Sequence, residues 1–89
     1  MNTSFFENVF EPTKAALLSK AYSKAVIAVG SSHELDRVDQ MKLANIIVAI
    51  ASSRLKAGGA LISEQDCENV ATIACDRFLR LLPDLGAGI

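Results

Sequence analysis

Apolar residues recur at intervals of three and four positions along most of this chain, which is the periodicity of one face of an α-helix. Apolar and polar residues do not alternate anywhere over a stretch long enough to require a strand. The pattern predicts helices over residues 12–29, 32–57 and 63–82. Because the connections between them are short, consecutive helices are expected to lie antiparallel. The sequence therefore predicts an all-α fold, a small up-down-up three-helix bundle with a short additional N-terminal helix.

Residues 1–11 form an aromatic segment in front of the first long helix. Ser4 and Glu7 have the spacing of a capping box, which is typical of a helix start. Pro12 then interrupts the helix, because proline lacks an amide hydrogen and disfavours helix at the preceding residue. We expect a short helix over residues 5–10 and a longer one that begins at Pro12. A single kinked helix is the alternative.

The helix predicted over residues 12–29 has a continuous apolar face and ends at Gly30, which suits a helix terminus. Its apolar positions are Leu18, Tyr22, Ala25 with Val26, and Val29. Small residues also recur at Ala15, Ser19 and Ser23. Such a stripe would let a second helix approach closely. A solvated face with good helix propensity explains it equally well, and this is the interpretation we adopt.

The helix predicted over residues 32–57 starts at a capping box of Ser31 and Glu34 and ends at Gly58 and Gly59. An apolar stripe runs through Leu35, Val38, Met41, Val48 and Leu55. Residues 43–51 are apolar on nearly every side of the helix. Because a helix of this kind is usually buried on most sides, we expect it to be the central element of the bundle.

The helix predicted over residues 63–82 begins with Ser63 as its cap and carries acidic residues in its first turn. Its core face is predicted at Val70, Ala74, Phe78 and Leu81, with Ala71 and Leu82 alongside. Pro83 cannot continue the helix, so the helix is expected to end there. We expect the tail, residues 83–89, to be loose.

The length fits one domain, residues 1–89, and the composition is that of a globular protein. Apolar residues make up 51% of the chain and charged residues 21%, which excludes a disordered chain. The net charge of −1 gives no general attraction to DNA, RNA or an anionic membrane surface. The apolar share is high for so short a chain. A partner is the usual way to cover apolar surface that remains exposed after folding.

A cytoplasmic location is the expectation from the N-terminus and from the cysteines. The first residues lack the basic region of a secretory signal, and no apolar run approaches the ~20 residues of a membrane span. Cys67 and Cys75 on one helix would lie about 12 Å apart, whereas a disulfide requires about 7 Å or less. Free cysteines are typical of a reducing compartment, and here we expect them to pack as small hydrophobic residues.

Few residues offer catalytic or metal-binding chemistry. His33 and Asp36 are spaced to form a histidine–carboxylate pair, but the chain has no second histidine for the usual nitrogen ligands of a metal. Cys67 lies near a helix N-terminus, which favours a thiolate, while Asp66 and Glu68 oppose that effect. We therefore expect no enzyme activity, no metal and no cofactor. These candidates support only an alternative, a ligand-binding helical bundle.

A helix-turn-helix can be drawn from the second long helix through the glycine pair into the third. Its recognition helix would begin with residues 64–68, which carry three carboxylates. Carboxylates at that position would repel DNA phosphates, and the segment lacks the arginines that commonly read guanine. A small DNA-binding regulatory domain is therefore kept only as an alternative.

The phenylalanines are the most unevenly distributed residues of the chain. Three of the four lie within the first ten positions, and with one valine they form an apolar cluster of Phe5, Phe6, Val9 and Phe10. The cluster is either a lid folded onto the bundle or an aromatic arm that docks onto a second chain or a partner groove. With a uniformly apolar second helix, it leads to the hypothesis of a non-enzymatic helical protein–protein interaction module that self-associates, most simply as a homodimer.

Overall fold

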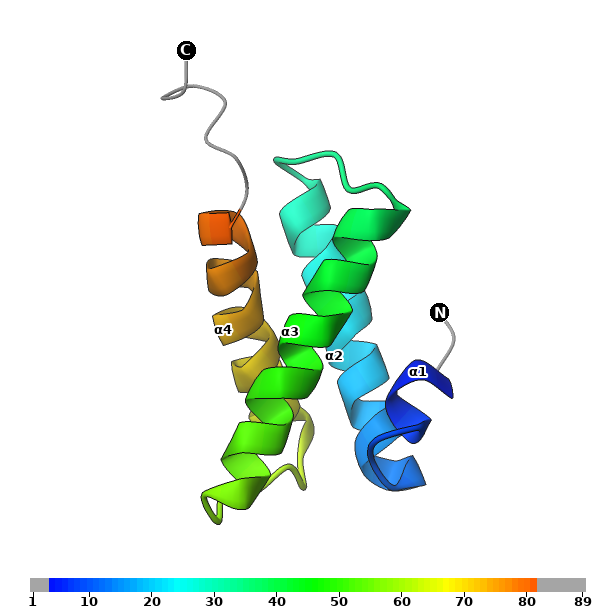
Figure 1. The fold of residues 1–89 in the computed structure, drawn as a ribbon, viewed down its shortest axis with the longest axis vertical. Helices are drawn as coiled ribbons and strands as arrows, with labels where there is room; N and C mark the ends of the chain where they lie inside the picture. Colours follow the sequence, from blue (N-terminus) through cyan, green and yellow to red (C-terminus); the bar gives the residue numbers. More distant parts are fainter. Residues whose placement is uncertain (1–3, 82–89) are drawn as a thin grey trace.

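The computed structural model describes residues 4–81, and its fold consists of helices without any strand in this range. The elements are α1 (Ser4–Glu7), α2 (Pro12–Gly30), α3 (Arg37–Lys56) and α4 (Glu64–Leu81). The three long helices run up, down and up, and α1 packs beside the first part of α2 (Figure 1). The predicted all-α bundle with a short additional N-terminal helix is therefore confirmed.

Helix α2 begins and ends where the sequence predicts. Pro12 occupies its first turn, and the Glu11 carboxylate caps the helix by accepting a hydrogen bond from the Lys14 amide at 3.1 Å. At the other end, the Ser31 amide and hydroxyl donate to the carbonyls of Ile27 and Ala28. The predicted apolar face is buried, with Val26 half-buried.

The small-residue stripe of α2 is not a solvated face, and this interpretation was wrong. Ala15 and Ser19 are buried, and Ser23 is half-buried with its hydroxyl donating to the Ser19 carbonyl. The stripe lies beside Tyr22, whose ring contacts Phe6 of α1. Because α1 folds back onto α2, this side of the helix is covered within the chain.

Helix α3 begins at Arg37, later than the predicted start at residue 32. Its N-cap is Asp36, whose carboxylate accepts a hydrogen bond from the Asp39 amide at 2.8 Å. The expected capping box of Ser31 and Glu34 does not form, because Ser31 already satisfies carbonyls at the end of α2. Residues 31–36 consequently form the connection between the two helices.

The buried face of α3 differs from the predicted stripe. Its buried residues are Leu43, Ala44, Ile47, Ile50 and Ala51. Val38 and Met41 are instead 61% and 52% exposed, and Val48 and Leu55 are half-buried. Asn45 and Ala49 are also exposed, so within one chain α3 is not buried on most sides. A segment that is apolar all round fits several registers, and packing against α2 and α4 selects the one that is seen.

Helix α4 starts with the predicted serine cap. The Asp66 amide donates to Ser63 Oγ at 3.1 Å, and the Asp66 carboxylate accepts from the amides of Ile62 and Ser63. The predicted core positions Val70, Ala71, Ala74 and Phe78 are buried. Leu81 was predicted in the core but is 73% exposed, because it lies in the last turn of the helix. Leu82, Pro83 and the predicted loose tail lie outside the described residues.

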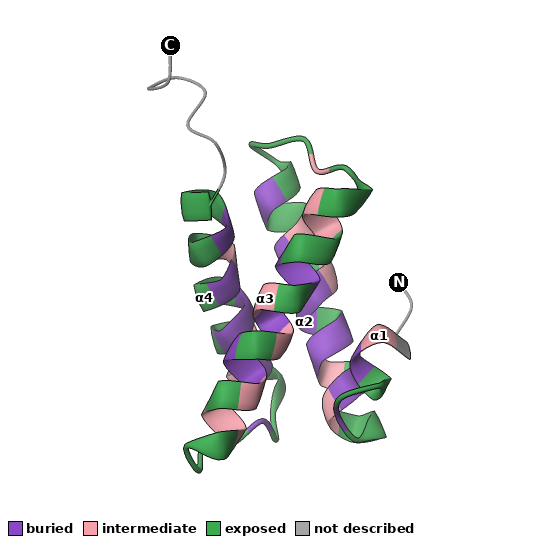
Figure 2. Ribbon diagram, viewed as in Figure 1, coloured by how far each residue is buried: buried purple, intermediate pink, exposed green. Residues whose placement is uncertain are grey.

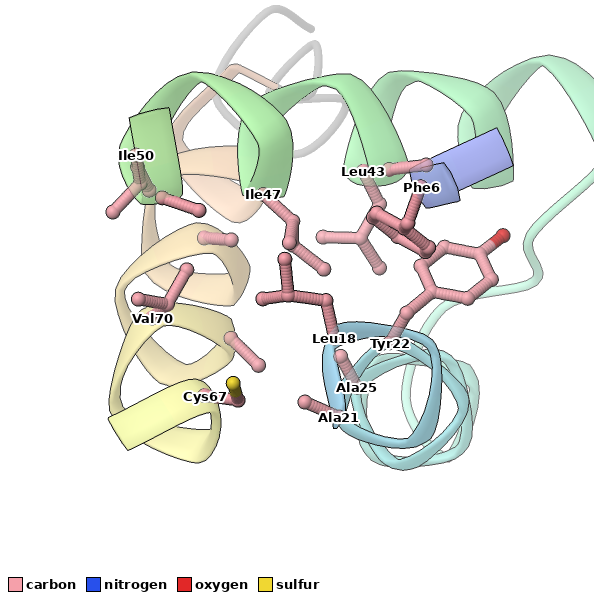
Figure 3. Close-up of a cluster of buried hydrophobic side chains, with 14 of the residues drawn as sticks. Phe6, Leu18, Ala21, Tyr22, Ala25, Leu43, Ile47, Ile50, Cys67 and Val70 are labelled. Carbon is pink, nitrogen blue, oxygen red and sulfur yellow. The ribbon is translucent and has the colours of Figure 1, made fainter. Parts of the chain in front are cut away.

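The core is a single cluster to which all four helices contribute (Figure 2). In Figure 3, Leu18 of α2, Ile47 of α3 and Val70 of α4 point toward one another. Each is almost fully buried, and burial of one such side chain contributes about 1.5–3 kcal/mol of hydrophobic free energy. Cys67 of α4 faces the alanines of α2, where small side chains let the two helices approach closely (Figure 3).

No helix within residues 4–81 combines the length and the apolar character that crossing a membrane would require.

Candidate functional site

The aromatic cluster of α1 packs within the chain. Phe6 and Phe10 are buried, and the Phe10 amide donates to the Phe6 carbonyl at 2.8 Å, which turns the segment back onto the bundle. The Phe6 ring meets the rings of Phe5 and Tyr22 edge-on, with centroids 5.2 and 5.9 Å apart. Phe5 is half-buried, and Val9, at 54%, is the exposed member of the cluster. Of the two interpretations of the cluster, the structure agrees with a lid folded onto the bundle. Phe6 and Phe10 are buried within the chain and are not presented to a second chain.

Tyr22 connects α2 to the beginning of α3. Its hydroxyl donates a hydrogen bond to the Gln40 carbonyl at 3.2 Å, and burial raises the pKa of the phenol. The Gln40 side chain in turn donates to the Leu35 carbonyl at 3.3 Å. These contacts hold the first turn of α3 and the end of the preceding connection against the bundle.

His33 and Asp36 do not form the pair that their spacing allows. Both are exposed in the α2–α3 connection, and the Asp36 carboxylate is used as the cap of α3. Among residues 4–81, no group of three or more histidine, cysteine, aspartate or glutamate side chains is placed to hold a metal ion.

Both cysteines are free thiols, as expected from their separation. Cys67 is buried, and burial raises its pKa; Asp66 raises it further, while Arg54 acts in the opposite direction. Cys75 is half-buried, and burial likewise raises its pKa. A raised pKa keeps a thiol protonated near neutral pH, which makes both cysteines poor nucleophiles.

Two ion pairs join α2 to α4, and the sequence interpretation missed them. Lys20 binds Glu64 and Lys24 binds Glu68, with nitrogen–oxygen distances of 2.5 and 2.8 Å. The hydrogen bond from Lys20 lowers the pKa of Glu64, and the hydrogen bond to Glu68 raises the pKa of Lys24. Each lysine is 44 residues from its glutamate, as expected for helices that run in the same direction. The sequence contained one signal for these ion pairs: the two lysines are four residues apart, and so are the two glutamates.

A surface without charge runs along the side of α3 that faces away from the core. Between Lys42 and Arg54 no residue carries a charge, although parts of this segment are exposed. We define the outer face of α3 by residues spaced alternately by three and four positions: Val38, Met41, Asn45, Val48 and Ser52. Val38, Met41 and Asn45 are exposed, and the other two are half-buried.

A groove of about 360 Å³ lies between α3 and α4, and we refer to it as the α3–α4 groove. Two arginines line it, Arg54 from the last turns of α3 and Arg77 from α4. Ile50 and Ala57 contribute apolar lining and Ser53 a hydroxyl group. Nothing in the sequence pattern indicates this groove, because its two arginines are distant in the chain.

Comparison with known proteins provides no family for this chain. No protein-family model matches it, and neither the curated proteins nor the solved structures include a significant match. The candidate surfaces are therefore assessed on their own geometry and chemistry.

Proposed function

We propose that this protein is a non-enzymatic helical interaction module that associates with a second copy of itself, as a homodimer, through the outer face of α3. The observation that carries the proposal is the absence of charge from residues 43–53, part of which is exposed. The water-facing side of a helix normally carries charged and polar residues. Val38 and Met41, nearer the start of the helix, are the large apolar side chains that α3 exposes.

The spacing of the outer face favours a second copy as the occupant. Alternation of three and four positions is the pattern by which two helices pack side by side in a coiled coil. Asn45 lies at the middle of this pattern. In two-helix coiled coils, an asparagine at such a position pairs with its copy across the interface and fixes the register of the two helices. A twofold dimer brings the same patch of both chains together, and a face without charge creates no like-charge repulsion there.

The positions of the candidate catalytic residues support a non-enzymatic role. His33 lies in the α2–α3 connection, whereas Cys67 is buried at the start of α4, at the opposite end of the bundle (Figure 1). A helix-turn-helix role gains no support either, since Glu64 and Glu68, in the segment that would read DNA, are engaged with α2 through their ion pairs. We also propose a cytoplasmic location, because two free cysteines suit a reducing compartment.

Light scattering of the full chain over a concentration series tests the proposal. The parent is expected to have the mass of a dimer, and a Val38→Lys/Met41→Lys variant that of a monomer, because two buried lysines would repel their copies across the interface. Ile27→Lys is the matched control, since Ile27 is a 74% exposed apolar residue on α2. A parent that is monomeric throughout, or a control that dissociates as readily as the variant, would contradict the proposal.

A further inference from the structure

Arg54 and Arg77 line the same groove, and neither forms an ion pair with another residue of the range 4–81. Within the described part of the chain, Lys14, Lys20, Lys24 and Arg80 each form an ion pair with a carboxylate. Neither groove arginine has a carboxylate within 4.0 Å among residues 4–81. Two like charges that line the same groove repel each other, and an anion bound between them would relieve that repulsion.

The backbone turn after α3 packs closely against the side chain of Arg54. Gly59 donates its amide to the Arg54 carbonyl at 2.8 Å. A Cβ atom added at Gly59 would lie 2.5 Å from Cγ of Arg54, so the glycine packs directly on the aliphatic part of the arginine. This contact limits the positions that the half-buried Arg54 side chain can take.

The acid nearest to Arg54 is already engaged elsewhere. Asp66 feels the charge of Arg54, but its carboxylate accepts hydrogen bonds from the amides of Ile62 and Ser63 at the start of α4. Its role as a helix cap leaves the guanidinium of Arg54 available to another anion. The carboxyl end of α3 opposes an anion in the groove, because the last carbonyls of a helix carry partial negative charge. The amides of Ala57, Gly58 and Gly59 reduce this effect, since they donate to three of those carbonyls.

We propose that the α3–α4 groove binds a small molecule through a phosphate group held between Arg54 and Arg77. A phosphate monoester carries a charge of about −1.5 to −2 at neutral pH, which balances two guanidinium groups. Arginine presents N–H donors in a planar fork that suits phosphate oxygens. The hydroxyl of Ser53 adds a donor, and Ile50 and Ala57 offer apolar surface to the rest of the molecule. The groove volume of about 360 Å³ is at the lower end of the range for small-molecule sites.

NMR titration of the full chain with inorganic phosphate, at constant ionic strength and pH, tests this site. The signals to follow are the side-chain N–H groups of both arginines and the backbone amides of Ser53 and Arg77. The parent is expected to show saturable shifts confined to the groove. Arg77→Gln, a change at an exposed residue that preserves the fold, is expected to weaken binding about tenfold or more, since hydrogen bonds to charged groups are the strong ones.

Arg37→Gln is the matched control, because it removes the same charge from an exposed arginine at the opposite end of α3 that forms no ion pair within residues 4–81. Binding in this variant should equal that of the parent. Two results would overturn the proposal: chemical-shift changes that do not saturate, or phosphate binding that is weakened equally in both variants. Either would show that phosphate is attracted to the positive charges of the protein in general. Equal binding of acetate would overturn the assignment to phosphate. The groove shares Ala49, Ile50 and Ser53 with the uncharged segment of residues 43–53, but it shares no residue with the outer face of α3, so the titration and the test of the dimer can fail independently.

Discussion

The hydroxyl of Tyr22 in α2 donates a hydrogen bond to the backbone carbonyl of Gln40 in the first turn of α3, 3.2 Å away. This bond joins α2 to α3 across the connection of residues 31–36. It is accompanied by an edge-on contact of the Tyr22 ring with Phe6, so one side chain links α1, α2 and α3. Tyr22 is therefore positioned to report on the packing of three helices.

Replacing Tyr22 with phenylalanine should lower the free energy of unfolding by about 0.5–1.5 kcal/mol, because the ring stays and only one hydrogen bond is lost. Urea unfolding followed by circular dichroism measures the change. A second effect follows from the raised pKa of Tyr22. The phenol ionises more readily in the unfolded chain, so the parent should lose stability as the pH rises above the usual tyrosine value of 10.0. The phenylalanine variant should lose less, and an equal loss in both would contradict this account.

Phe6→Ala should destabilise the fold by about 3–5 kcal/mol, since the ring is 1% exposed and its removal would leave a cavity under α1. Val9→Ala is the natural control, because Val9 belongs to the same cluster and is largely exposed; its effect should stay within about 0.5 kcal/mol. Chemical unfolding of both variants provides the comparison. Similar effects at the two positions would mean that α1 is not packed as a lid.

Gly59→Ala should destabilise the protein by about 1–3 kcal/mol, because the new methyl group would meet the Arg54 side chain and carbonyl, and the turn would have to shift. Gly30→Ala is its control: nothing lies within 4 Å of the added atom, and Gly30 is the last residue of α2. That change should leave stability unchanged or raise it by up to about 1 kcal/mol. Thermal unfolding of both variants would reveal whether the contact at Arg54 is as close as described.

Acid should weaken the fold through the cap of α4. Hydrogen bonds from the Ile62 amide and from Ser63 lower the pKa of Asp66 below its usual value of 3.8. A carboxyl group with a lowered pKa in the folded state contributes stability above its usual pKa and loses it as the pH falls through the folded value. Asp66→Asn should therefore reduce stability at pH 7 and reduce the further loss between pH 5 and pH 2. The free energy of unfolding of the parent and of the variant is measured at several pH values across this range. The same dependence on pH in both proteins would contradict the role of Asp66.

Local signals predicted the helix ends well where a single interpretation was available. The serine cap at Ser63 formed because nothing else competes for it. Ser31 failed as a cap because the carbonyls at the end of α2 were nearer partners, and Asp36 then capped α3. This competition between two adjacent helix ends cannot be seen from the spacing of Ser31 and Glu34 alone.

Tertiary placement decided what the pattern left open. The buried face of α3 could not be chosen from residues 43–51, because almost any side of that segment is apolar. The pairing of Lys20 with Glu64, and the groove that Arg54 and Arg77 both line, bring together residues that are distant in the chain and meet only when the helices pack. The sequence therefore predicts the type and order of the elements, whereas both candidate surfaces depend on the packed structure.

The two ion pairs between α2 and α4 have a consequence for how the helices could slide. Because both lysines and both glutamates are spaced by four residues, moving α4 one turn along α2 would still leave one pair, either Lys24 with Glu64 or Lys20 with Glu68. Lys24 already lowers the pKa of Glu64 through its charge. The ion pairs therefore hold the helices together without defining a unique axial position. That position is set by shape, through the fit of the fully buried Cys67 against the alanines of α2.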